Sequence, residues 1–483
     1  MLLSIKDNIN DKKKSLSQLF IAVGLIGIVT TLSLGNLPLF GIILLCPIFI
    51  ITLYFITNYP VILLYIIFIF SYLVLGISRY IEISGISVVF DILLFCSLLL
   101  PLIHSIILRN VQWKQSLNVM NIALLCWAVF CLLEIANPTA MINAWMLSRL
   151  LIYGGLLASV AIALVVSDKK HIKYFLRIYS VLSLLAVMKA IMQKYIGFDE
   201  AELKWLAEGG GITHLISTGT RYFSFFTDAG NFGSNMGCAS VIFGITSFVI
   251  KNKYLKVYYL LTGALCFYAM MLSGTRGAMI VPLGGIATFI IISKNIKAIG
   301  IGSILLLFIY VFFAFTTIGQ NNDQIRRMRT AFSPNEDGSF LVRKQNREKL
   351  GLYLKNKPFG EGLGLAGVEN QKTSFRFTTS IPHDSWYVKI WVETGIVGLL
   401  LYIGILLVIV GRCSYILMFK IKNTELKGLL SAMLCGIVGM MLSAYGNAFW
   451  GQFPTMIISF MFLALIMKGD FFDKQLTTKE TAK

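Results

Sequence analysis

The sequence has 483 residues, of which 57% are hydrophobic and 13% are charged, and its formal net charge is +19. Hydrophobic runs along nearly the whole chain exclude a soluble globular protein and predict one that crosses a membrane many times. The positive charge does not indicate nucleic-acid binding, because most of it lies in short loops between hydrophobic runs, where it sets orientation.

The hydrophobic runs predict the fold class. A helix crosses the bilayer with about 20 apolar residues, and runs of this kind have centres near residues 26, 47, 68, 97, 126, 156, 181, 240, 264, 285, 308, 401, 436 and 460. They predict an all-α polytopic membrane protein with about 14 transmembrane helices. No small-residue cleavage site follows the first run, so we expect it to be retained.

Basic residues alternate between the short loops and predict the orientation. With a cytoplasmic N-terminus, the positive-inside rule agrees for each basic loop, namely Lys12–Lys14, Arg109–Lys114, Lys169–Lys170, Lys251–Lys256, Lys294–Lys297 and Arg412–Lys427. The opposite short loops carry no lysine or arginine, with Arg79 as the exception. We therefore expect both termini in the cytoplasm.

Two long polar segments then lie outside, and they divide the chain. We expect N-terminal helices over 1–192, an external loop over 193–230, further helices over 231–319, a large external loop with short helices over 320–384, and C-terminal helices with a cytoplasmic tail over 385–483. The large loop has eleven basic residues against seven acidic ones. This excess favours an anionic partner, either a substrate or lipid headgroups.

Metal and cofactor motifs are absent from the sequence. Seven of the eight cysteines lie within hydrophobic runs, and Cys413 lies at a cytoplasmic edge. There is no His-Glu-x-x-His motif, and no Asp-x-Asp lies near an external loop. We expect no disulfide, no metal and no cofactor, so phosphate chemistry would have to rely on arginine.

Arginines occur at several external positions. Arg221 lies in STGTRYFSFFTDAGNFGSNMG, and Arg276 lies in MLSGTRGAMI, a tight turn between two apolar runs. An arginine at the membrane boundary either extends its charge toward water or binds a ligand. For Arg276 we favour ligand binding, because anchoring alone does not need a Gly-Thr-Arg-Gly turn.

The stretch GSFLVRKQNREKLGLYLKNKPFGEGLG predicts an external helix that begins near Ser339 and is stopped by Pro358 and Gly360. Arg343 and Arg347 share one face of it with Leu350 and Leu354. Two adjacent guanidinium groups suit a phosphate, which they bind through paired hydrogen bonds. The alternative for Arg343 is a surface ion pair with Glu336 or Glu348.

His383 lies where the polar segment enters the next hydrophobic run, in IPHDSWYVKIWVETGIVGLLL. An imidazole at the mouth of the membrane can act as a general base. The alternative is a surface histidine that caps the following helix. Asp384 is a less favoured orienting partner, because adjacent side chains seldom face each other. Trp386 and Tyr387 read first as interfacial residues and second as sugar-stacking platforms.

One further pair has a structural interpretation. Glu134 and Arg149 lie near the outer ends of consecutive hydrophobic runs. We expect them to form an ion pair across the hairpin.

Four motifs in this order resemble the O-antigen ligase/polymerase superfamily. They are the arginine in an aromatic, Gly and Asn context before a span, the SGTRGA turn, the arginine helix followed by P.G.GLG, and the histidine followed by E.GI.GLLL. The resemblance covers about Arg221 to Gly404. The chain has Gly230-Asn231 where members often show Pro-Asn, and His383-Asp384 where they show His-Asn.

The resemblance implies a membrane glycosyltransferase of surface polysaccharide biosynthesis in the bacterial inner membrane. Such an enzyme moves a glycan from a polyprenyl-pyrophosphate donor, such as undecaprenyl pyrophosphate, to a sugar hydroxyl on the periplasmic face without a metal. On the matching positions, the catalytic candidates are His383, Arg276, Arg347 and Arg221. The substrate-binding candidates are Arg343, Trp386, Tyr387 and Asn231.

Expected partners are the lipid-linked donor, a glycan or lipid-linked acceptor, membrane lipids and other polysaccharide-assembly proteins. The sequence leaves the acceptor open. We slightly prefer a repeat-unit polymerase because of the number of spans, and the alternative is a ligase that transfers polysaccharide to the lipid A-core of lipopolysaccharide. A peptidoglycan glycosyltransferase lacks the motifs. A lipid-linked oligosaccharide flippase is the alternative of another class, although no inverted repeat is evident.

Overall fold

The structure is a computed structural model that describes residues 56–81, 85–108, 111, 113–216, 219–294, 296–332 and 338–481. The chain divides into two compact units, Met1–Leu63 and Leu64–Lys483. Of the first unit only residues 56–63 are described, and they include a short helical segment at 56–58. The predicted spans near residues 26 and 47 therefore lie outside the described residues.

The described residues are almost entirely helical. The first half contains α3 (Val61–Tyr80), α4 (Ile86–Leu108), α5 (Trp113–Ser116), α6 (Val119–Leu133), η1 (Glu134–Ala136), α7 (Ile142–Leu147), α8 (Arg149–Val165), α9 (Lys170–Tyr195), α10 (Glu200–Trp205), η2 (Leu206–Gly210) and α11 (Gly211–His214). A two-residue antiparallel pair follows, β1 (Leu215–Ile216) with β2 (Gly219–Thr220).

The second half of the described chain is also helical. It contains α12 (Ala229–Val249), α13 (Lys253–Leu272), η3 (Arg276–Met279), α14 (Ile280–Ser293), α15 (Ile296–Phe315), α16 (Asp323–Arg329), η4 (Thr330–Phe332), α17 (Gly338–Leu354), η6 (Val368–Asn370), α18 (Phe377–Ser380), α19 (Trp386–Tyr415), η7 (Ile416–Lys420), α20 (Thr424–Ser443), α21 (Thr455–Met467) and α22 (Gly469–Thr481).

The helices confirm an all-α polytopic membrane protein. Among the described residues, 10 helices are long and apolar enough to cross a membrane, or up to 11 if the bent pair α21 and α22 is one span. Helix α15 has a shorter apolar stretch. Each predicted centre from residue 68 onward lies within a helix. The total of about 14 spans and the placement of the termini stay predictions.

Helix α12 lies at the centre of the second unit, where it packs against α13, α14 and α20. Every residue from Ala229 to Ala239 is buried. This stretch, AGNFGSNMGCA, consists largely of small residues, which let helix backbones approach closely in a bilayer, where the hydrophobic effect does not drive helix association. Helix α12 therefore provides a fixed base for the polar segments that precede it.

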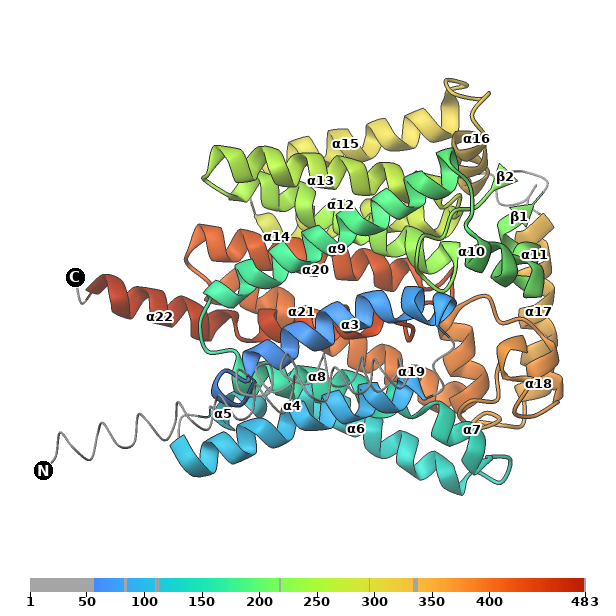
Figure 1. Cartoon of the computed structure of the whole chain (residues 1–483), viewed down its shortest axis with the longest axis horizontal. Coiled ribbons are helices and arrows are strands. Elements are labelled where there is room, and N and C mark those ends of the chain that lie inside the picture. The colour runs from blue at the N-terminus through green and yellow to red at the C-terminus, as the bar shows by residue number, and fades with distance from the viewer. Residues whose placement is uncertain are drawn as a thin grey trace, which may run out of the picture. The chain divides into compact units, whose positions relative to one another are not determined.

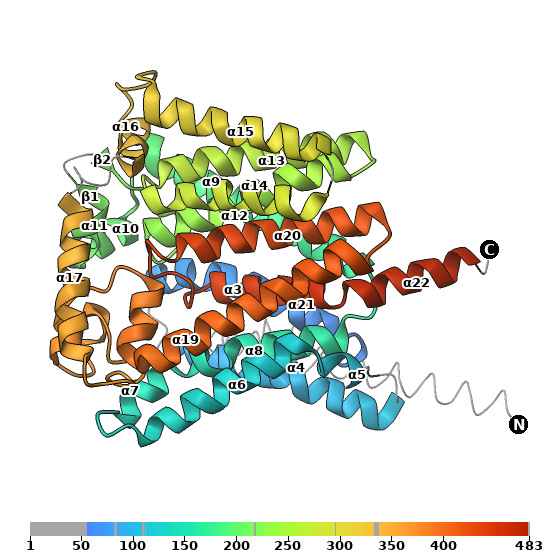
Figure 2. The same cartoon turned by 180° about the vertical axis from the view of Figure 1, so that it is seen from behind.

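The two long polar segments of the second unit gather at one end of its helices. Figures 1 and 2 show α10, α11, α16, α17 and α18 together at this end, opposite α5 and α22. Segments that are more than a hundred residues apart in the sequence thus share one face of the helical body. Their common placement agrees with the predicted topology, although which end faces outward stays a prediction.

Arg79, the exception to the charge pattern, has a structural role at this end. Its guanidinium donates to the carbonyl oxygens of Ser224, at 3.0 Å, and of Phe226. It also lies over the rings of Trp205 and Phe223, 4.8 and 4.7 Å from their centroids. Arg79 therefore holds the first long segment against α3, which explains a basic residue on the side where the short loops otherwise lack lysine and arginine.

The predicted ion pair between Glu134 and Arg149 is wrong. Arg149 instead pairs with Asp91 of α4 at 2.6 Å, and Tyr153 donates to the same carboxylate at 2.6 Å. Glu134 accepts a hydrogen bond from Asn137 at 3.1 Å. The hairpin interpretation considered only consecutive helices, whereas α8 packs against α4 as well as α6.

Cysteine labelling tests the topology. Lys372 and Lys422 are both exposed, the first in the large polar segment and the second in a basic loop. In intact cells, Lys372→Cys should react with a membrane-impermeant maleimide, whereas Lys422→Cys should react only after permeabilisation, because the reagent does not cross the bilayer. The parent protein serves as the blank. Labelling at 422 but not at 372 in intact cells would reverse the orientation.

Candidate functional site

The Ser273–Arg276 turn and the first polar segment are joined through Arg221. This guanidinium donates to the hydroxyl of Thr275 and to the carbonyl of Thr213, each at 2.9 Å. Thr275 in turn donates to the carbonyl of Ala229 at 2.9 Å. Two of the motifs that carry the family resemblance are thus brought into direct contact.

His214 fixes the backbone that carries Arg221. Its Nε2 accepts from the backbone N–H of Ala229 at 3.0 Å, so Nδ1 carries the hydrogen and donates to the carbonyl of Gly210 at 2.8 Å. Burial lowers the pKa of His214 to about 4, which keeps the ring neutral and able to accept. Asp228 accepts from the N–H groups of Gly230 and Asn231 and caps α12.

The predicted arginine helix is confirmed as α17, Gly338–Leu354. Its apolar face packs against α19 through a cluster that contains Leu350, Leu354, Val388 and Val392. Arg343 and Arg347 lie on the turns that precede these leucines, so burial of the leucines determines where both guanidinium groups lie.

The P.G.GLG and E.GI.GLLL motifs form one backbone contact. Gly395 interrupts α19 with φ 66° and ψ −170°, a conformation that is essentially restricted to glycine. The 358–362 segment lies in the resulting kink, where the N–H of Glu361 donates to Val392 and that of Gly362 donates to Glu393, both at 2.9 Å. A Cβ on Gly360 would lie 2.4 Å from the nitrogen of Gly395.

Glu361 strengthens this contact with ion pairs. The buried carboxylate binds Lys357 at 2.6 Å and Arg376 at 2.8 Å. Arg376 also donates to the carbonyl of Thr139 at 2.7 Å, which connects the large polar segment to the loop between η1 and α7. Arg376 and Lys357 therefore have structural roles. The candidates for ligand binding are the other arginines predicted for the site, namely Arg221, Arg276, Arg343 and Arg347.

Four of the predicted site residues line one cavity of about 280 Å³, namely Arg276, Arg343, Arg347 and His383. Arg276 donates to the hydroxyl of Thr330 at 3.1 Å, and Arg347 donates to the hydroxyl of Tyr445 at 2.5 Å. Apolar groups of the lining come from Met279 of η3 and from Ile280 and Leu283 of α14. The cavity thus combines fixed guanidinium groups with a surface suited to a lipid.

Arg343 forms an ion pair with Asp384 at 3.8 Å rather than with Glu348. Glu348 is exposed on the same helix, and Glu336 lies outside the described residues. The carboxylate of Asp384 therefore faces an arginine of the cavity, and it is not the partner that orients His383.

His383 is buried, with 6% of its side chain exposed. Neither ring nitrogen has a hydrogen-bond partner, so the alternative of a surface histidine that caps a helix is wrong. Burial lowers the pKa of His383 to about 4; the carboxylate of Glu369 opposes this shift, and the ammonium of Lys389 reinforces it. The imidazole is therefore neutral at pH 7 and has a lone pair available for a proton.

Arg221 lies beside this cavity without lining it. Burial lowers the pKa of its guanidinium, and the positive charges of Arg343 and Arg276 lower it further, while Asp228 raises it. These interactions indicate that Arg221 belongs to the same cluster of positive charge. A buried guanidinium among like charges is costly, and an anion bound there would relieve that cost.

The other predicted substrate-binding residues lie elsewhere, and their roles stay predictions. Asn231 is fully buried and donates to Phe453 at 2.8 Å and to Thr227 at 2.9 Å. The indole N–H of Trp386 donates to Tyr402 at 3.0 Å, and Tyr387 donates to the carbonyl of Met441 at 2.8 Å. Hydrogen bonds of this kind are typical of residues that hold packed helices together.

Several residues in or beside the cavity belong to no motif that marks them in the sequence. Thr330 and Tyr445 are ordinary residues that contact arginines 54 and 98 positions away. Arg327 donates to the carbonyl of Gly274 at 2.6 Å, but it stood among several charged residues of the large segment. Glu369, 3.6 Å from His383, was likewise counted only as one acid of that segment.

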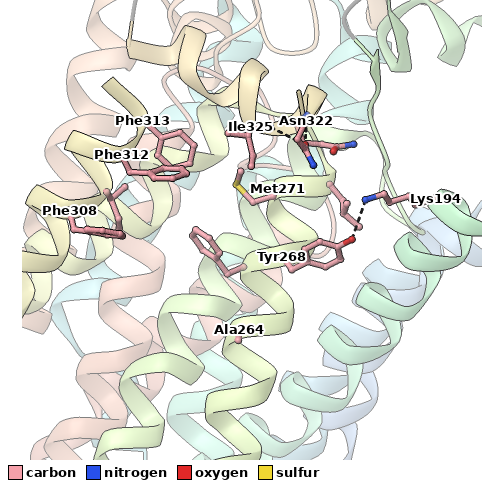
Figure 3. Close-up of a pocket in the computed structure, with 13 residues that line it drawn as sticks. Lys194, Ala264, Tyr268, Met271, Phe308, Phe312, Phe313, Asn322 and Ile325 are labelled. Carbon is pink, nitrogen blue, oxygen red and sulfur yellow. Dashed lines mark hydrogen bonds between the residues drawn. The ribbon is translucent and has the colours of Figure 1, made fainter. Parts of the chain in front are cut away.

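An apolar cavity of about 410 Å³ is lined mainly by residues of α13, α15 and α16. Figure 3 shows Ala264, Tyr268 and Met271 of α13 facing Phe308, Phe312 and Phe313 of α15, with Asn322 and Ile325 at one end. Tyr268 accepts a hydrogen bond from Lys194 at 3.2 Å. The segment formed by α16 and η4 contributes to both cavities, since Ile325 lines this one and Thr330 lines the arginine cavity.

The helices and the cavity define a polytopic membrane protein with a basic, partly apolar site at one end. A family model described as O-antigen ligase matches residues 261–403. This stretch matches the O-antigen ligase/polymerase superfamily and contains three of the four motifs that carry the resemblance, while the Arg221 motif precedes it. No curated protein matches the chain. The family and the membrane helices point to a glycan-transfer enzyme of polysaccharide assembly in the bacterial inner membrane.

The kink at Gly395 makes a stability prediction. Gly395→Ala should destabilise the protein, because the new Cβ would lie 2.0 Å from the carbonyl oxygen of Pro358 and because the backbone conformation itself costs about 1–3 kcal/mol. Gly404→Ala is the matched control in the same helix, where a Cβ meets nothing within 4 Å. Thermal unfolding of the purified proteins should show a lower midpoint for Gly395→Ala alone. Equal midpoints would contradict the proposed contact.

Proposed function

We propose that the protein transfers a glycan from a polyprenyl-pyrophosphate donor to a sugar hydroxyl on the non-cytoplasmic face of the membrane. The observation that carries this proposal is the convergence of Arg276, Arg343, Arg347 and a buried neutral imidazole on one cavity. A pyrophosphate ester needs several fixed cations, and a sugar hydroxyl needs a base. The cavity offers both within one site.

The reaction assigns a role to each group. The acceptor oxygen forms a bond to the anomeric carbon of the donor, while the bond from that carbon to the pyrophosphate oxygen breaks. The proton of the acceptor hydroxyl passes to His383, which later releases it to water. The pyrophosphate leaves with the bonding electron pair, and the arginines stabilise the negative charge that develops on it.

The arginines are suited to this role by the contacts that hold them. Arg347 donates to the hydroxyl of Tyr445 and to the carbonyl of Arg343, and Arg221 donates to a hydroxyl and a carbonyl. Neutral oxygen partners orient a guanidinium without neutralising it. Charge stabilisation by such preorganised groups needs little rearrangement during the reaction.

The apolar cavity between α13 and α15 is a candidate site for part of the isoprenoid chain. Its lining is mostly aromatic and aliphatic, and the segment formed by α16 and η4 contributes residues to both cavities. A lipid-linked donor has to keep its tail among apolar groups and its sugars in water. Adjacent apolar and basic cavities support a donor of this type.

The acceptor decides between the two activities of the superfamily. A polymerase joins the glycan to another lipid-linked repeat unit, whereas a ligase transfers finished polysaccharide to lipid A-core or another acceptor. We favour the polymerase because of the number of predicted spans. Deletion of the gene distinguishes them: single lipid-linked repeat units accumulate without a polymerase, and long lipid-linked chains accumulate without a ligase.

Substitutions in the cavity test the assigned roles. His383→Ala should lower glycan transfer by about 10²–10⁴ and leave donor binding intact, because the histidine acts on the acceptor. Arg276→Ala and Arg347→Ala should lower transfer by about 10²–10³ and also weaken donor binding. Arg→Lys replacements should restore little, because lysine lacks the planar fork. Transfer and binding are measured with purified protein and a lipid-linked donor.

Lys344→Ala, an exposed position on the same helix as Arg347, is the control and should behave like the parent protein. If His383→Ala transfers glycan at the parental rate with parental amounts of protein, the base is assigned wrongly. Lipid-linked glycan that crosses the membrane in vesicles without any transfer would instead favour the flippase alternative.

Chelation tests whether arginine alone stabilises the pyrophosphate. We expect the purified protein to turn over a lipid-linked donor at an unchanged rate in excess EDTA, because guanidinium groups take the place that a divalent ion holds in many pyrophosphate sites. The assay compares initial rates with and without the chelator. A complete loss of activity that magnesium restores would overturn this part of the proposal.

A further inference from the structure

The edge of the His383 ring that carries its nitrogens faces the turn at Gly367–Glu369. A Cβ on Gly367 would lie 2.3 Å from Nδ1 and 2.4 Å from a carboxylate oxygen of Glu369. Gly367 also has φ 82°, which favours glycine. The turn therefore brings the Glu369 carboxylate to the imidazole only because position 367 has no side chain.

Glu369 lies between two basic groups. Its Oε1 is 3.6 Å from Nε2 of His383 and 3.3 Å from Nζ of Lys389. Burial raises the pKa of the Glu369 carboxyl, but the positive charge of His383 in its protonated form and that of Lys389 outweigh this effect, so the pKa lies below its ordinary value. The carboxylate is therefore ionised at neutral pH and faces a ring that has no hydrogen-bond partner.

Lys389 is itself held by a second carboxylate. Glu393 lies one helical turn further along α19, with Oε1 3.9 Å from Nζ of Lys389. The Glu393 side chain is fully buried, and neither carboxylate oxygen has a hydrogen-bond partner. A buried carboxylate is costly unless it is paired, and Lys389 is the partner that the structure gives to Glu393. This glutamate belongs to the E.GI.GLLL motif, and the transfer reaction described above assigns it no role.

We propose that Glu369 is the positioning residue of the base: its carboxylate lies along the nitrogen-bearing edge of the His383 ring, orients the ring and stabilises the positive charge that the ring gains when it takes the proton of the acceptor hydroxyl. Lys389, anchored by Glu393, keeps this carboxylate in place. The inference rests on the proposed function of His383. It assigns a role to Glu369 and to the buried charges of α19.

The geometry fits a resting enzyme. A separation of 3.6 Å is too long for a hydrogen bond, and hydrogen bonds between catalytic groups often shorten only when substrate binds. A carboxylate beside the ring orients the imidazole and makes it a stronger base. This effect counteracts the burial of His383, which otherwise makes the ring a weak base.

The rate should depend on pH through His383, because only the neutral ring accepts a proton. Glu369, Asp384 and Lys389 act on the charge of the ring, and Arg276, Arg343 and Arg347 line the same cavity. Removing the Glu369 charge disfavours the protonated ring, so the acidic limb of the pH–rate profile moves to lower pH. Removing the Lys389 charge favours the protonated ring, so that limb moves to higher pH.

The experiment measures pH–rate profiles of full-length protein with a lipid-linked donor. Glu369→Gln should lower the rate at pH 7 by about 10-fold to 10²-fold, a part of the 10²–10⁴ that a general base supplies, and should move the acidic limb to lower pH. Lys389→Met should move it to higher pH. Glu369→Asp should recover part of the lost rate. Donor binding should stay unchanged in all three variants.

Glu348→Gln and Lys349→Met make the same charge changes at exposed positions of α17 and should leave the profile unchanged. A loss of rate in Glu369→Gln without a shift of the acidic limb would indicate a structural role and overturn the inference, as would a parental rate and profile. If the parent protein transfers no glycan at all, or His383→Ala is fully active, the proposed function fails first.

Discussion

The contact between the kink of α19 and the 358–362 segment is the constraint on which the site depends. At Gly395 the helix exposes backbone groups that bind the chain around Gly360, and side chains at either position would prevent it. This contact fixes the end of the segment that begins with α17 and the start of the segment that leads to His383. The arginines and the imidazole therefore approach each other because two backbones pack without side chains between them.

Charge organises the same region around that contact. Acidic partners hold the basic residues that connect the segment to the helices, as Glu361 does for Arg376. Arg347 and Arg221, by contrast, donate to hydroxyl and carbonyl oxygens. Paired cations thus build the scaffold, and cations oriented by neutral groups keep their charge for an anionic ligand. The proposed role of Glu369 follows the same division, since it orients a neutral base.

The sequence predicted elements whose signal is local. Hydrophobic runs located every described transmembrane helix, and the position of Pro358 with the spacing of Leu350 and Leu354 located α17. Prediction from the sequence failed where the residue that forms an ion pair or a hydrogen bond with a given side chain lies far along the chain. Asp91 pairs with Arg149 across 58 positions, and Tyr445 binds Arg347 across 98. Nothing in either local pattern marks these residues.

The sequence by itself determined the membrane class, the apolar helices and the arginine and histidine motifs, because hydrophobic length and residue chemistry are properties of short stretches. The tertiary structure alone decided which of these residues meet. It brought Arg276, Arg343, Arg347 and His383 to one cavity and left Asn231 and Trp386 in helix packing. The physical reason is that a cavity forms where segments that are distant in the sequence pack together. Which residues line it therefore depends on how those segments pack and which of their side chains are buried.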